Sequence, residues 1–326
     1  MPDPVLALDL GGTKIRAALV HGLDAVEVET APRLEHVAEV PTPAAEGAAA
    51  ILGAALDLAE RVCEGTAVQA VGISSAGVVD VEDGRITHAT DSLTGWAGTA
   101  VTTPFMERFG VPVAALNDVH AHGLGEARFG TGRGRGSLLL MAVGTGIGGC
   151  QVQGGTVVVG ARGAAGHVGH VPVPEAEGVP CPCGRTGHLE GLASGPGVVR
   201  LAARLRTADP ASGASSPDPS AAPRDGRELA AAAVRGDRAA LEAYRLAGRA
   251  TGRVLGALLN VLDPDVVALT GGVADAGVTV WLEALAAGIA EEAMDVVAAT
   301  PVLPASAGSQ AALLGAAVRA VEVPVR

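Results

Sequence analysis

The spacing of apolar residues along the chain predicts a series of strands and helices. Residues 5–10 (VLALDL) and 15–20 (IRAALV) are apolar runs on either side of a glycine turn, a pattern typical of a β-hairpin. Other short apolar runs predict buried strands at 70–74, 111–116, 137–143 and 266–272. Helical spacing of Ala and Leu predicts helices over 43–62, 119–128, 237–262 and 310–320, the third of them ended by Pro264. This mixture indicates an α/β fold.

A strand–glycine turn–strand unit occurs twice. The first covers residues 8–15 and the second covers 141–152, where SLLLMAV is followed by GTGIGG and by short strands at QVQ and TVVVG. The repetition suggests a duplicated architecture. Residues 207–227 have no apolar periodicity and are rich in Pro, Ser and Ala, so we expect a flexible surface insertion there.

Composition narrows the class of protein. The chain has 326 residues, of which 48% are hydrophobic, enough for a sizeable core; with 46 glycines and 2% aromatic residues, that core is built from Ala, Val and Leu. The net charge is −12 and no long basic run occurs, which argues against nucleic-acid binding by bulk electrostatics.

Targeting and membrane signals are weak. The N-terminal segment has Asp3 and Asp9 and no basic region before an apolar stretch, so we do not expect a signal peptide. The longest uncharged run, 137–161, is interrupted by glycines, which favours two strands over a membrane span. Four cysteines in a chain of this length, two of them beside histidines, favour reduced thiols and a metal, and with them a cytoplasmic location.

Two glycine turns are candidate phosphate-binding elements. In DLGGTK (9–14) the turn exposes unhindered N–H groups, Thr13 adds a hydroxyl, and Asp9 would hold Mg²⁺ through waters; an ordinary hairpin turn is the alternative. GTGIGG (144–149) satisfies the G-x-G-x-x-G pattern, but a strand follows it and residues 150–174 contain no acidic residue, so a dinucleotide fold is rejected. A phosphate-binding hairpin with Thr145 as a donor fits better.

Asn117 and Asp118 lie where a predicted strand gives way to a helix. Catalytic side chains are common at this place in α/β folds, and an aspartate can accept the proton of a hydroxyl nucleophile. A helix N-cap is the alternative reading of the same pair.

His170, Cys181, Cys183 and His188 form the pattern H-x10-C-x-C-x4-H. Four such ligands within 19 residues suit a closed tetrahedral zinc site, and free buried thiols are the alternative. A metal there would also fix Glu190 and His167, which lie within three residues of two of the ligands.

Together these motifs resemble the ROK family (repressors, open reading frames, kinases) of sugar kinases. The resemblance runs from Leu8 to about Ala317. It includes DLGGTK, NDVHAHGLGE (117–126) and VGTGIGGC (143–150), and the segment GAAGHVGH…CPCGRTGHLE matches the hallmark of the family. The resemblance implies an actin-like (ribonuclease H-like) two-domain ATPase fold with ATP and sugar in the cleft. Residues 1–117 plus about 305–326 would form a smaller α/β domain, and 118–304 a larger one with the zinc site and the insertion.

The resemblance also implies roles for individual residues. Asp118 would be the catalytic base, with Asn117, His167, His170, Glu190 and Ser92 on the sugar side and His170, Cys181, Cys183 and His188 on a structural Zn²⁺. The ATP–Mg²⁺ side would be formed by Asp9, Gly11, Gly12, Thr13, Lys14, Thr145, Gly146, Gly271 and Gly272. Three positions depart from the family pattern: His188 replaces a cysteine, Ser92 an asparagine, and His167 the glutamate of many glucokinases.

These implications predict an ATP-dependent kinase that phosphorylates the 6-hydroxyl of a hexose or N-acetylhexosamine. The G-H-x-G-H pattern favours N-acetylmannosamine, glucokinase is the alternative, and a sugar-responsive transcriptional regulator is disfavoured because Asp9 leaves no room for a preceding DNA-binding module. The expected partners are sugar and ATP, without nucleic acid or membrane, and the family implies a homodimer.

Overall fold

The computed structural model describes residues 3–23, 32–90, 93–208 and 223–322. Predicted sugar contact Ser92 and most of the predicted insertion, 209–222, lie outside these described residues. The chain forms two compact units. Unit 1 consists of Met1–Leu139, Cys150–Gly166 and Ala305–Arg326, and unit 2 of Leu140–Gly149 and His167–Pro304.

Unit 1 contains a five-stranded mixed sheet with the order β3-β2-β1-β4-β7. Its strands are β1 (Val5–Leu10), β2 (Lys14–His21), β3 (Arg33–Pro41), β4 (Ala70–Ser75) and β7 (Val113–Asn117). β1 and β2 form the predicted antiparallel hairpin, β2 also pairs antiparallel with β3, and β1, β4 and β7 run parallel. A small second sheet pairs β5 (Val78–Val79) with β6 (Ile86–His88).

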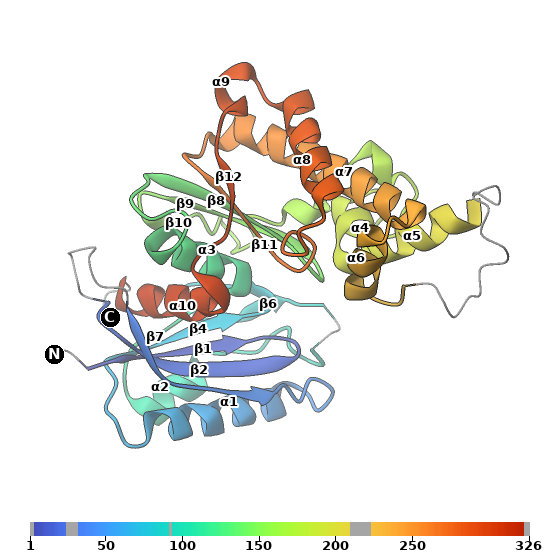
Figure 1. The fold of residues 1–326 in the computed structure, drawn as a ribbon. Coiled ribbons are helices and arrows are strands. Elements are labelled where there is room, and N and C mark those ends of the chain that lie inside the picture. Colours follow the sequence, from blue (N-terminus) through green and yellow to red (C-terminus); the bar gives the residue numbers. More distant parts are fainter. Residues whose placement is uncertain (1–2, 24–31, 91–92, 209–222, 323–326) are drawn as a thin grey trace. The chain divides into compact units, whose positions relative to one another are not determined.

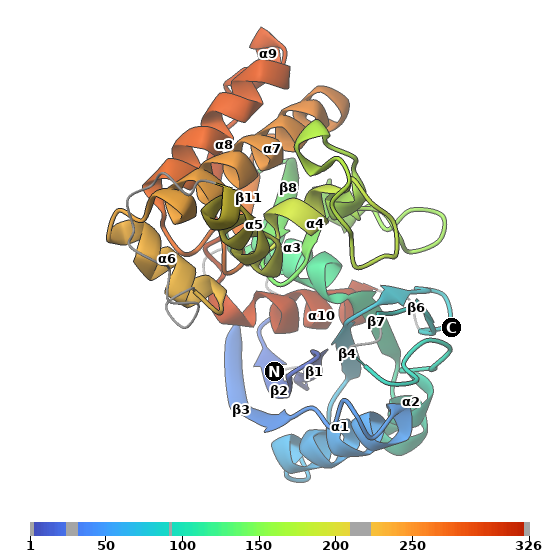
Figure 2. The same cartoon turned by 90° about the vertical axis from the view of Figure 1, so that its right-hand side faces the viewer.

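Helices cover both faces of this sheet (Figures 1 and 2). On one face lie α1 (Ala48–Cys63) and α2 (Thr103–Phe109), and on the other α10 (Ala311–Glu322), which also packs on α3 (Asp118–Phe129). Alternate residues of a strand point to opposite faces, so Leu6 and Leu8 bury against α1 while Val5 and Ala7 bury against α10. Gly72 permits close packing, since a Cβ there would lie 2.0 Å from the carbonyl oxygen of Ala316.

The other large sheet has the order β10-β9-β8-β11-β12. Its strands are β8 (Ser137–Val143), β9 (Ile147–Gln153), β10 (Thr156–Val157), β11 (Val267–Thr270) and β12 (Val302–Pro304). β8 and β9 are sequential neighbours joined by the second glycine turn, as β1 and β2 are by the first. This repeats the strand–turn–strand unit that the sequence predicted.

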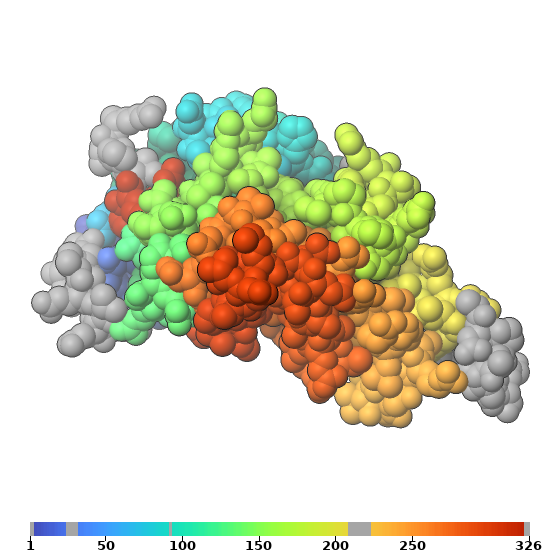
Figure 3. Space-filling model, turned by 90° about the horizontal axis from the view of Figure 1, so that it is seen from above, coloured from blue at the N-terminus to red at the C-terminus, as the bar shows by residue number. Residues whose placement is uncertain are grey.

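Unit 2 carries most of the remaining helices. They are α4 (Leu189–Ala193), α5 (Gly195–Ala208), α6 (Gly226–Val234), α7 (Arg238–Leu262), α8 (Thr279–Glu292), α9 (Asp295–Ala298) and the 3-10 turns η1 (Val168–His170) and η2 (Pro174–Ala176); η4 (Gly308–Gln310) belongs to unit 1. α7 and α8 approach closely, because a Cβ on Gly252 would lie 2.1 Å from the carbonyl oxygen of Leu285. The space-filling view looks onto the α8 and α9 surface, in orange and red (Figure 3).

Most predicted elements occur where the pattern placed them, and the main differences lie at the ends of elements. The predicted helix over 43–62 begins at Ala48, because Gly47 adopts φ 90° and interrupts the helical backbone. The strand predicted at TVVVG is limited to Thr156–Val157. The ends of the predicted insertion are helical, since α5 continues to Ala208 and α6 begins at Gly226.

The two compact units divide the chain differently from the predicted domains. Residues 118–139 and 150–166 group with unit 1, in part because α3 packs on α10, where a Cβ on Gly125 would lie 2.1 Å from the carbonyl oxygen of Ala311. The domain boundary at residue 117 therefore stays a prediction. Among the helices that the structure describes, none has both the length and the apolar character needed to cross a bilayer.

Candidate functional site

The carboxyl ends of three parallel strands bring predicted site residues of unit 1 to one edge of its sheet. β1 ends just after Asp9, β4 ends at Ser75, and β7 ends at Asn117, directly before Asp118. Ser75 pairs in register with both Leu10 and Asn117. This edge is where α/β folds place ligands and catalytic groups.

Asp118 is the first residue of α3, and its two neighbours in the chain donate hydrogen bonds to its carboxylate. Oδ1 accepts a hydrogen bond from the amide nitrogen of Val119 at 2.9 Å and from Nδ2 of Asn117 at 2.8 Å. Burial raises the pKa of the Asp118 carboxyl to about 6, and the negative charge of Asp9 adds to the rise, while the hydrogen bonds from Val119 and Asn117 oppose it. Near neutral pH the group is an ionised base with an appreciable proton affinity.

Asn117 is the N-cap of α3, as the alternative reading of the sequence held. Its Oδ1 accepts from the amide nitrogens of Val119 and His120, and its Nδ2 donates to the carbonyl oxygen of Gly77 at 2.9 Å as well as to Asp118. Both donors of the amide are therefore engaged within the protein. A sugar hydroxyl at Asn117 would have to replace one of these bonds.

Asp9 lies between two other polar side chains of the sheet. Its Oδ2 accepts from Nη2 of Arg16 at 2.7 Å and from Nε of Arg16 at 3.3 Å, and its Oδ1 accepts from Oγ of Ser74 at 2.8 Å. The side chain is 15% exposed. A carboxylate is the kind of hard oxygen acceptor that suits Mg²⁺ and its bound waters, so Asp9 fits the predicted water-mediated magnesium role.

The GGTK turn that follows is open to solvent. Gly12 and Thr13 are exposed, and a Cβ on Gly12 would meet nothing within 4 Å, so a ligand can approach this backbone closely. Lys14 forms an exposed 2.9 Å ion pair with Glu39. Gly11 closes the turn by donating to the carbonyl oxygen of Lys14.

Unit 2 brings the other two glycine turns together. The amide nitrogen of Val273 donates to the carbonyl oxygen of Val143 at 2.9 Å, which joins the strand end before Gly144 to the segment after Gly272. Gly271 adopts φ 96°, and a Cβ there would lie 2.6 Å from the carbonyl oxygen of Val143, so only glycine fits without a backbone shift.

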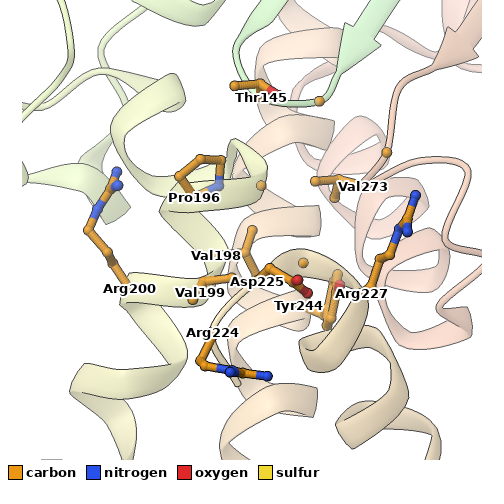
Figure 4. A pocket seen from close by; sticks show the side chains of 14 residues that line it. Thr145, Pro196, Val198, Val199, Arg200, Arg224, Asp225, Arg227, Tyr244 and Val273 are labelled. Atoms are coloured by element: carbon orange, nitrogen blue, oxygen red, sulfur yellow. The ribbon is translucent and has the colours of Figure 1, made fainter. Parts of the chain in front are cut away.

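These turns border a pocket of about 630 Å³ within unit 2 (Figure 4). Thr145 lies at one end, and Arg200 from α5 and Arg227 from α6 project on opposite sides. The full lining comprises Gly144, Thr145, Gly195, Pro196, Val198, Val199, Arg200, Arg224, Asp225, Gly226, Arg227, Tyr244, Gly272 and Val273. A pocket with apolar walls, exposed glycine backbone and arginines at its edge suits a nucleotide, whose base is flat and whose phosphates are anionic.

The four predicted metal ligands converge in unit 2. One ligand atom from each of His170, Cys181, Cys183 and His188 lies within 4.8 Å of the others. Nδ1 of His170 is 3.6 Å from Sγ of Cys181, and Nδ1 of His188 is 3.2 Å from Sγ of Cys183. Tetrahedral zinc with bonds of about 2.0–2.3 Å requires ligand separations of roughly 3.3–3.8 Å, so these two pairs lie close to the spacing of a zinc site, and imidazole nitrogen and thiolate sulfur are donors that zinc takes.

Burial acts in opposite directions on the two kinds of metal ligand in this cluster. Burial lowers the pKa of His170, which keeps the imidazole neutral, as a metal ligand must be. Burial raises the pKa of Cys181 to about 11; the backbone hydrogen bond with Cys183 opposes the rise, and the side chain and charge of Cys183 add to it. A bound metal would have to displace that thiol proton.

Glu190 connects the cluster to the second glycine turn. α4 begins at Leu189, directly after His188, and Oε2 of Glu190 accepts a 2.8 Å hydrogen bond from the amide nitrogen of Ile147. The space there is limited, since a Cβ on Gly146 would lie 2.9 Å from that oxygen. His167 is exposed, and its ring stacks on His170 with centroids 6.0 Å apart.

The structure thus gathers the predicted residues into two sets, each within one unit. Asp9, the GGTK turn, Asn117 and Asp118 lie in unit 1, and the metal ligands, His167, Glu190 and the other glycine turns lie in unit 2. Sequence reasoning missed Arg16 and Ser74. The register of the hairpin would have revealed Arg16, because a short turn at 11–13 places residue 16 opposite residue 9. It also missed Arg200, Arg227 and Tyr244, for which the sequence carries no local signal.

Comparison with known proteins agrees with these motifs. A glucokinase from Halalkalibacterium halodurans is 30% identical over 279 residues, which cover 84% of this chain and 82% of that protein. A kanosamine kinase from Amycolatopsis mediterranei is 34% identical over 326 residues, covering 98% of each. An N-acetylmannosamine kinase from Escherichia coli is 29% identical over 269 residues, covering 82% of each.

Solved structures with related sequences have the same fold. The ROK hexokinase from Thermus thermophilus superimposes with a TM-score of 0.81 at 34% identity, covering 98% of both chains. A ROK family glucokinase from Streptomyces griseus, solved in complex with glucose and AMPPNP, gives a TM-score of 0.77 at 30% identity, covering 98% of this chain and 100% of that one. These matches confirm the predicted α/β, actin-like fold. Since the model of the ROK family also matches residues 5–322, the chain belongs to the ROK family.

Proposed function

We propose that this protein is an ATP-dependent sugar kinase that transfers the γ-phosphoryl group to the 6-hydroxyl of a hexose or N-acetylhexosamine. The observation that carries the proposal is the Asp118 carboxylate at the end of β7, with its pKa of about 6, in a chain whose relatives are named sugar kinases. A general base acts best when its pKa lies near the operating pH.

Asp118 would take the proton of the sugar hydroxyl as the oxygen attacks the γ-phosphorus and ADP departs. Phosphoryl transfer needs little covalent chemistry from the protein, so positioning and electrostatics supply most of the rate. Asn117 fixes one oxygen of Asp118 and caps its helix, which restricts the carboxylate to one orientation. We assign Asn117 this orienting role and keep its sugar contact as a prediction.

ATP would bind at the glycine turns. Thr145, Gly146, Gly271 and Gly272 would contact phosphates from unit 2, with the base in the pocket bounded by α5 and α6. Gly11, Gly12, Thr13 and Lys14 would contact phosphates from unit 1. Exposed glycine amides suit this role because they donate hydrogen bonds without side-chain hindrance.

Two metal ions belong to the proposal. Mg²⁺ would be held by Asp9 through water, and when bound it would neutralise charge on the triphosphate. Zn²⁺ would be held by His170, Cys181, Cys183 and His188, where it would fix the start of α4 and so the Glu190 carboxylate. Glu190, His170 and His167 would contact the sugar.

The proposed choice among sugars rests on one residue, His167. His167 replaces the glutamate expected of many glucokinases, and an imidazole, which carries no negative charge, suits an uncharged acetamido substituent better than a carboxylate does. This favours N-acetylmannosamine as the substrate. Glucose is the alternative, supported by the relatives named glucokinase, which are as similar in sequence as the N-acetylmannosamine kinase.

A coupled assay of ADP release tests the proposal. Purified protein with Mg²⁺ and ATP is offered glucose, mannose, N-acetylglucosamine and N-acetylmannosamine, and kcat/KM is compared among them. The proposal expects turnover with at least one sugar, highest with N-acetylmannosamine, and a 6-phosphate product. Absence of turnover with all of these sugars, in folded protein that binds AMPPNP, would contradict it. The predicted homodimer is a separate expectation, which light scattering of the same sample measures.

A further inference from the structure

Three side chains form a polar row across the sheet of unit 1. Asp9 on β1 lies directly opposite Arg16 on β2 and directly opposite Ser74 on β4. Neighbours across a sheet on one face are about 4.5–5.5 Å apart at Cβ, so their side chains meet. Here Arg16 reaches Oδ2 of Asp9 from one side and Ser74 reaches Oδ1 from the other.

Arg16 is itself fixed at its far end. Its Nη1 donates to the carbonyl oxygen of Ser309, in the η4 turn that precedes α10, while Nε and Nη2 are bonded to Asp9. The Arg16 side chain is 16% exposed and that of Asp9 is 15% exposed. A charge pair shielded to this degree, with a planar guanidinium held at three nitrogens, is more rigid than a surface ion pair.

The pairing limits what Asp9 can do toward a cation. An unpaired carboxylate beside Mg²⁺ can replace one of its waters and bind it directly. In this row the guanidinium offsets the negative charge and occupies lone pairs of Oδ2, and Ser74 occupies one of Oδ1. What remains is a fixed acceptor of reduced charge, which suits a hydrogen bond from a metal-bound water better than direct coordination.

We propose that Arg16 is a positioning residue for Asp9, which together with Ser74 holds the carboxylate as a water-mediated contact of the nucleotide's Mg²⁺ and prevents its direct coordination. This inference rests on the proposed kinase function. It assigns Arg16 an effect opposite to that of a phosphate-binding arginine, because removing Arg16 should strengthen cation binding while it slows phosphoryl transfer.

The test uses Arg16→Met, Arg16→Lys and a matched control, Arg33→Met, which removes a 65% exposed arginine from another strand of the same sheet. Binding of Mg²⁺ to the AMPPNP-saturated protein is measured by calorimetry, kcat is measured in the coupled assay, and melting temperature reports folding. We expect Arg16→Met to bind Mg²⁺ roughly threefold to tenfold more tightly, since a neighbouring positive charge is lost. Its kcat should fall about tenfold because the carboxylate is misplaced.

Arg16→Lys should restore the Mg²⁺ affinity, since it keeps the charge, and restore kcat only in part, since a lysine cannot hold Asp9 at two nitrogens. Arg33→Met should match the wild type in all three readouts. Unchanged or weaker Mg²⁺ binding by Arg16→Met would overturn the inference, whatever happens to kcat; if that variant does not fold, the same comparison is made with Arg16→Gln. Failure of the proposed function is distinguishable, because it would show as a wild-type protein without turnover on any sugar, whereas the calorimetry needs no turnover.

Discussion

Nδ2 of Asn117 donates a 2.8 Å hydrogen bond to Oδ1 of Asp118, the next residue in the chain. This bond favours the ionised carboxylate, as does the bond from the amide nitrogen of Val119, whereas burial and the charge of Asp9 favour the protonated form. Burial has the largest effect, and the pKa of Asp118 rises to about 6. The side chain that caps the helix therefore also limits how far that pKa rises.

The pH dependence of kcat/KM should accordingly show an acid limb with an apparent pKa of about 6, with activity falling tenfold per pH unit below it, because only the ionised Asp118 accepts a proton. Asn117→Ser keeps an N-cap oxygen for α3 but removes the Nδ2 amide group that donates to Asp118, so the limb should move to higher pH. Initial rates between pH 5 and 8.5 at low sugar concentration measure both. A limb at the same pH in the two proteins would contradict the assignment.

Asp118→Asn should abolish turnover and, at neutral pH, raise stability. Below about pH 4 the carboxyl is protonated in the folded and the unfolded chain alike, so it contributes no difference. Between about pH 4 and 6 the unfolded chain ionises first, so stability falls as pH rises, and the loss is complete above the folded pKa of about 6.

Replacing the group by a neutral amide removes this loss. The melting temperature of Asp118→Asn should exceed that of the wild type at pH 7.5 and match it near pH 4, as scanning fluorimetry can measure. A difference in melting temperature that does not change with pH would show that burial does not raise the pKa of Asp118. Near-normal turnover of the variant would refute the role of Asp118 as a base.

Local pattern and spacing predicted much of this fold and site. The β1–β2 hairpin, the Asp237 start and Pro264 end of the long helix, and the four clustered metal ligands all follow from residues near one another in sequence. What the sequence could not predict depends on distant contacts. Arg16 bonds Ser309, 293 positions away, and two arginines of the pocket come from different helices, Arg200 from α5 and Arg227 from α6. One donor of the Asn117 amide is engaged by the carbonyl oxygen of Gly77, in a loop whose position the hydrophobic pattern does not predict.

The purified protein should carry about one zinc per chain. Cys181→Ser should lose most of it, since a serine hydroxyl is a poor zinc ligand, whereas His188→Cys should keep it, because a thiolate suits the same position. Cys63→Ser is the control: that cysteine is buried in α1 of unit 1, apart from the cluster. Elemental analysis of folded, active protein measures the content, and active wild type without zinc would refute the site.

Zinc loss should also weaken nucleotide binding. His188 directly precedes α4, and Glu190 in that helix holds the amide nitrogen of Ile147 beside the second glycine turn. Loosening the helix start releases this contact, so AMPPNP affinity should fall in Cys181→Ser by about twofold to tenfold, the equivalent of one hydrogen bond of roughly 0.5–1.5 kcal/mol. Equal AMPPNP affinity in zinc-free and zinc-loaded protein would show that zinc does not support the second glycine turn.

His167→Glu should move sugar preference toward glucose. The imidazole is exposed and stacks on His170, so a glutamate fits the space without repacking. A carboxylate would accept a hydrogen bond from a 2-hydroxyl and disfavour the acetamido carbonyl, which changes discrimination by roughly 1–3 kcal/mol, about 5–150-fold in the ratio of kcat/KM values. The KM for ATP is the internal control and should not change. An unaltered glucose to N-acetylmannosamine ratio would exclude His167 as the discriminating residue.

A conservative substitution of Glu126 should cause a large loss of stability. Its side chain is fully buried and accepts hydrogen bonds from the amide nitrogens of Thr131, Ser306 and Ala307 at 2.7–3.0 Å. Glutamine presents one oxygen and one N–H₂ group, so Glu126→Gln turns a donor toward at least one of these amides and leaves it unsatisfied. The cost should be about 1–3 kcal/mol in the free energy of unfolding.

Glu60→Gln is the matched control, because Glu60 forms an exposed ion pair with Arg108 and exposed pairs contribute about 0–1 kcal/mol. The shift in urea midpoint is measured for both variants by far-UV circular dichroism, and we expect the larger shift for Glu126→Gln. Equal shifts would mean that the three amides find other acceptors when the carboxylate is lost. A larger shift for Glu126→Gln would show that this carboxylate ties the chain entering α10 to the end of α3, the helix that begins with Asp118.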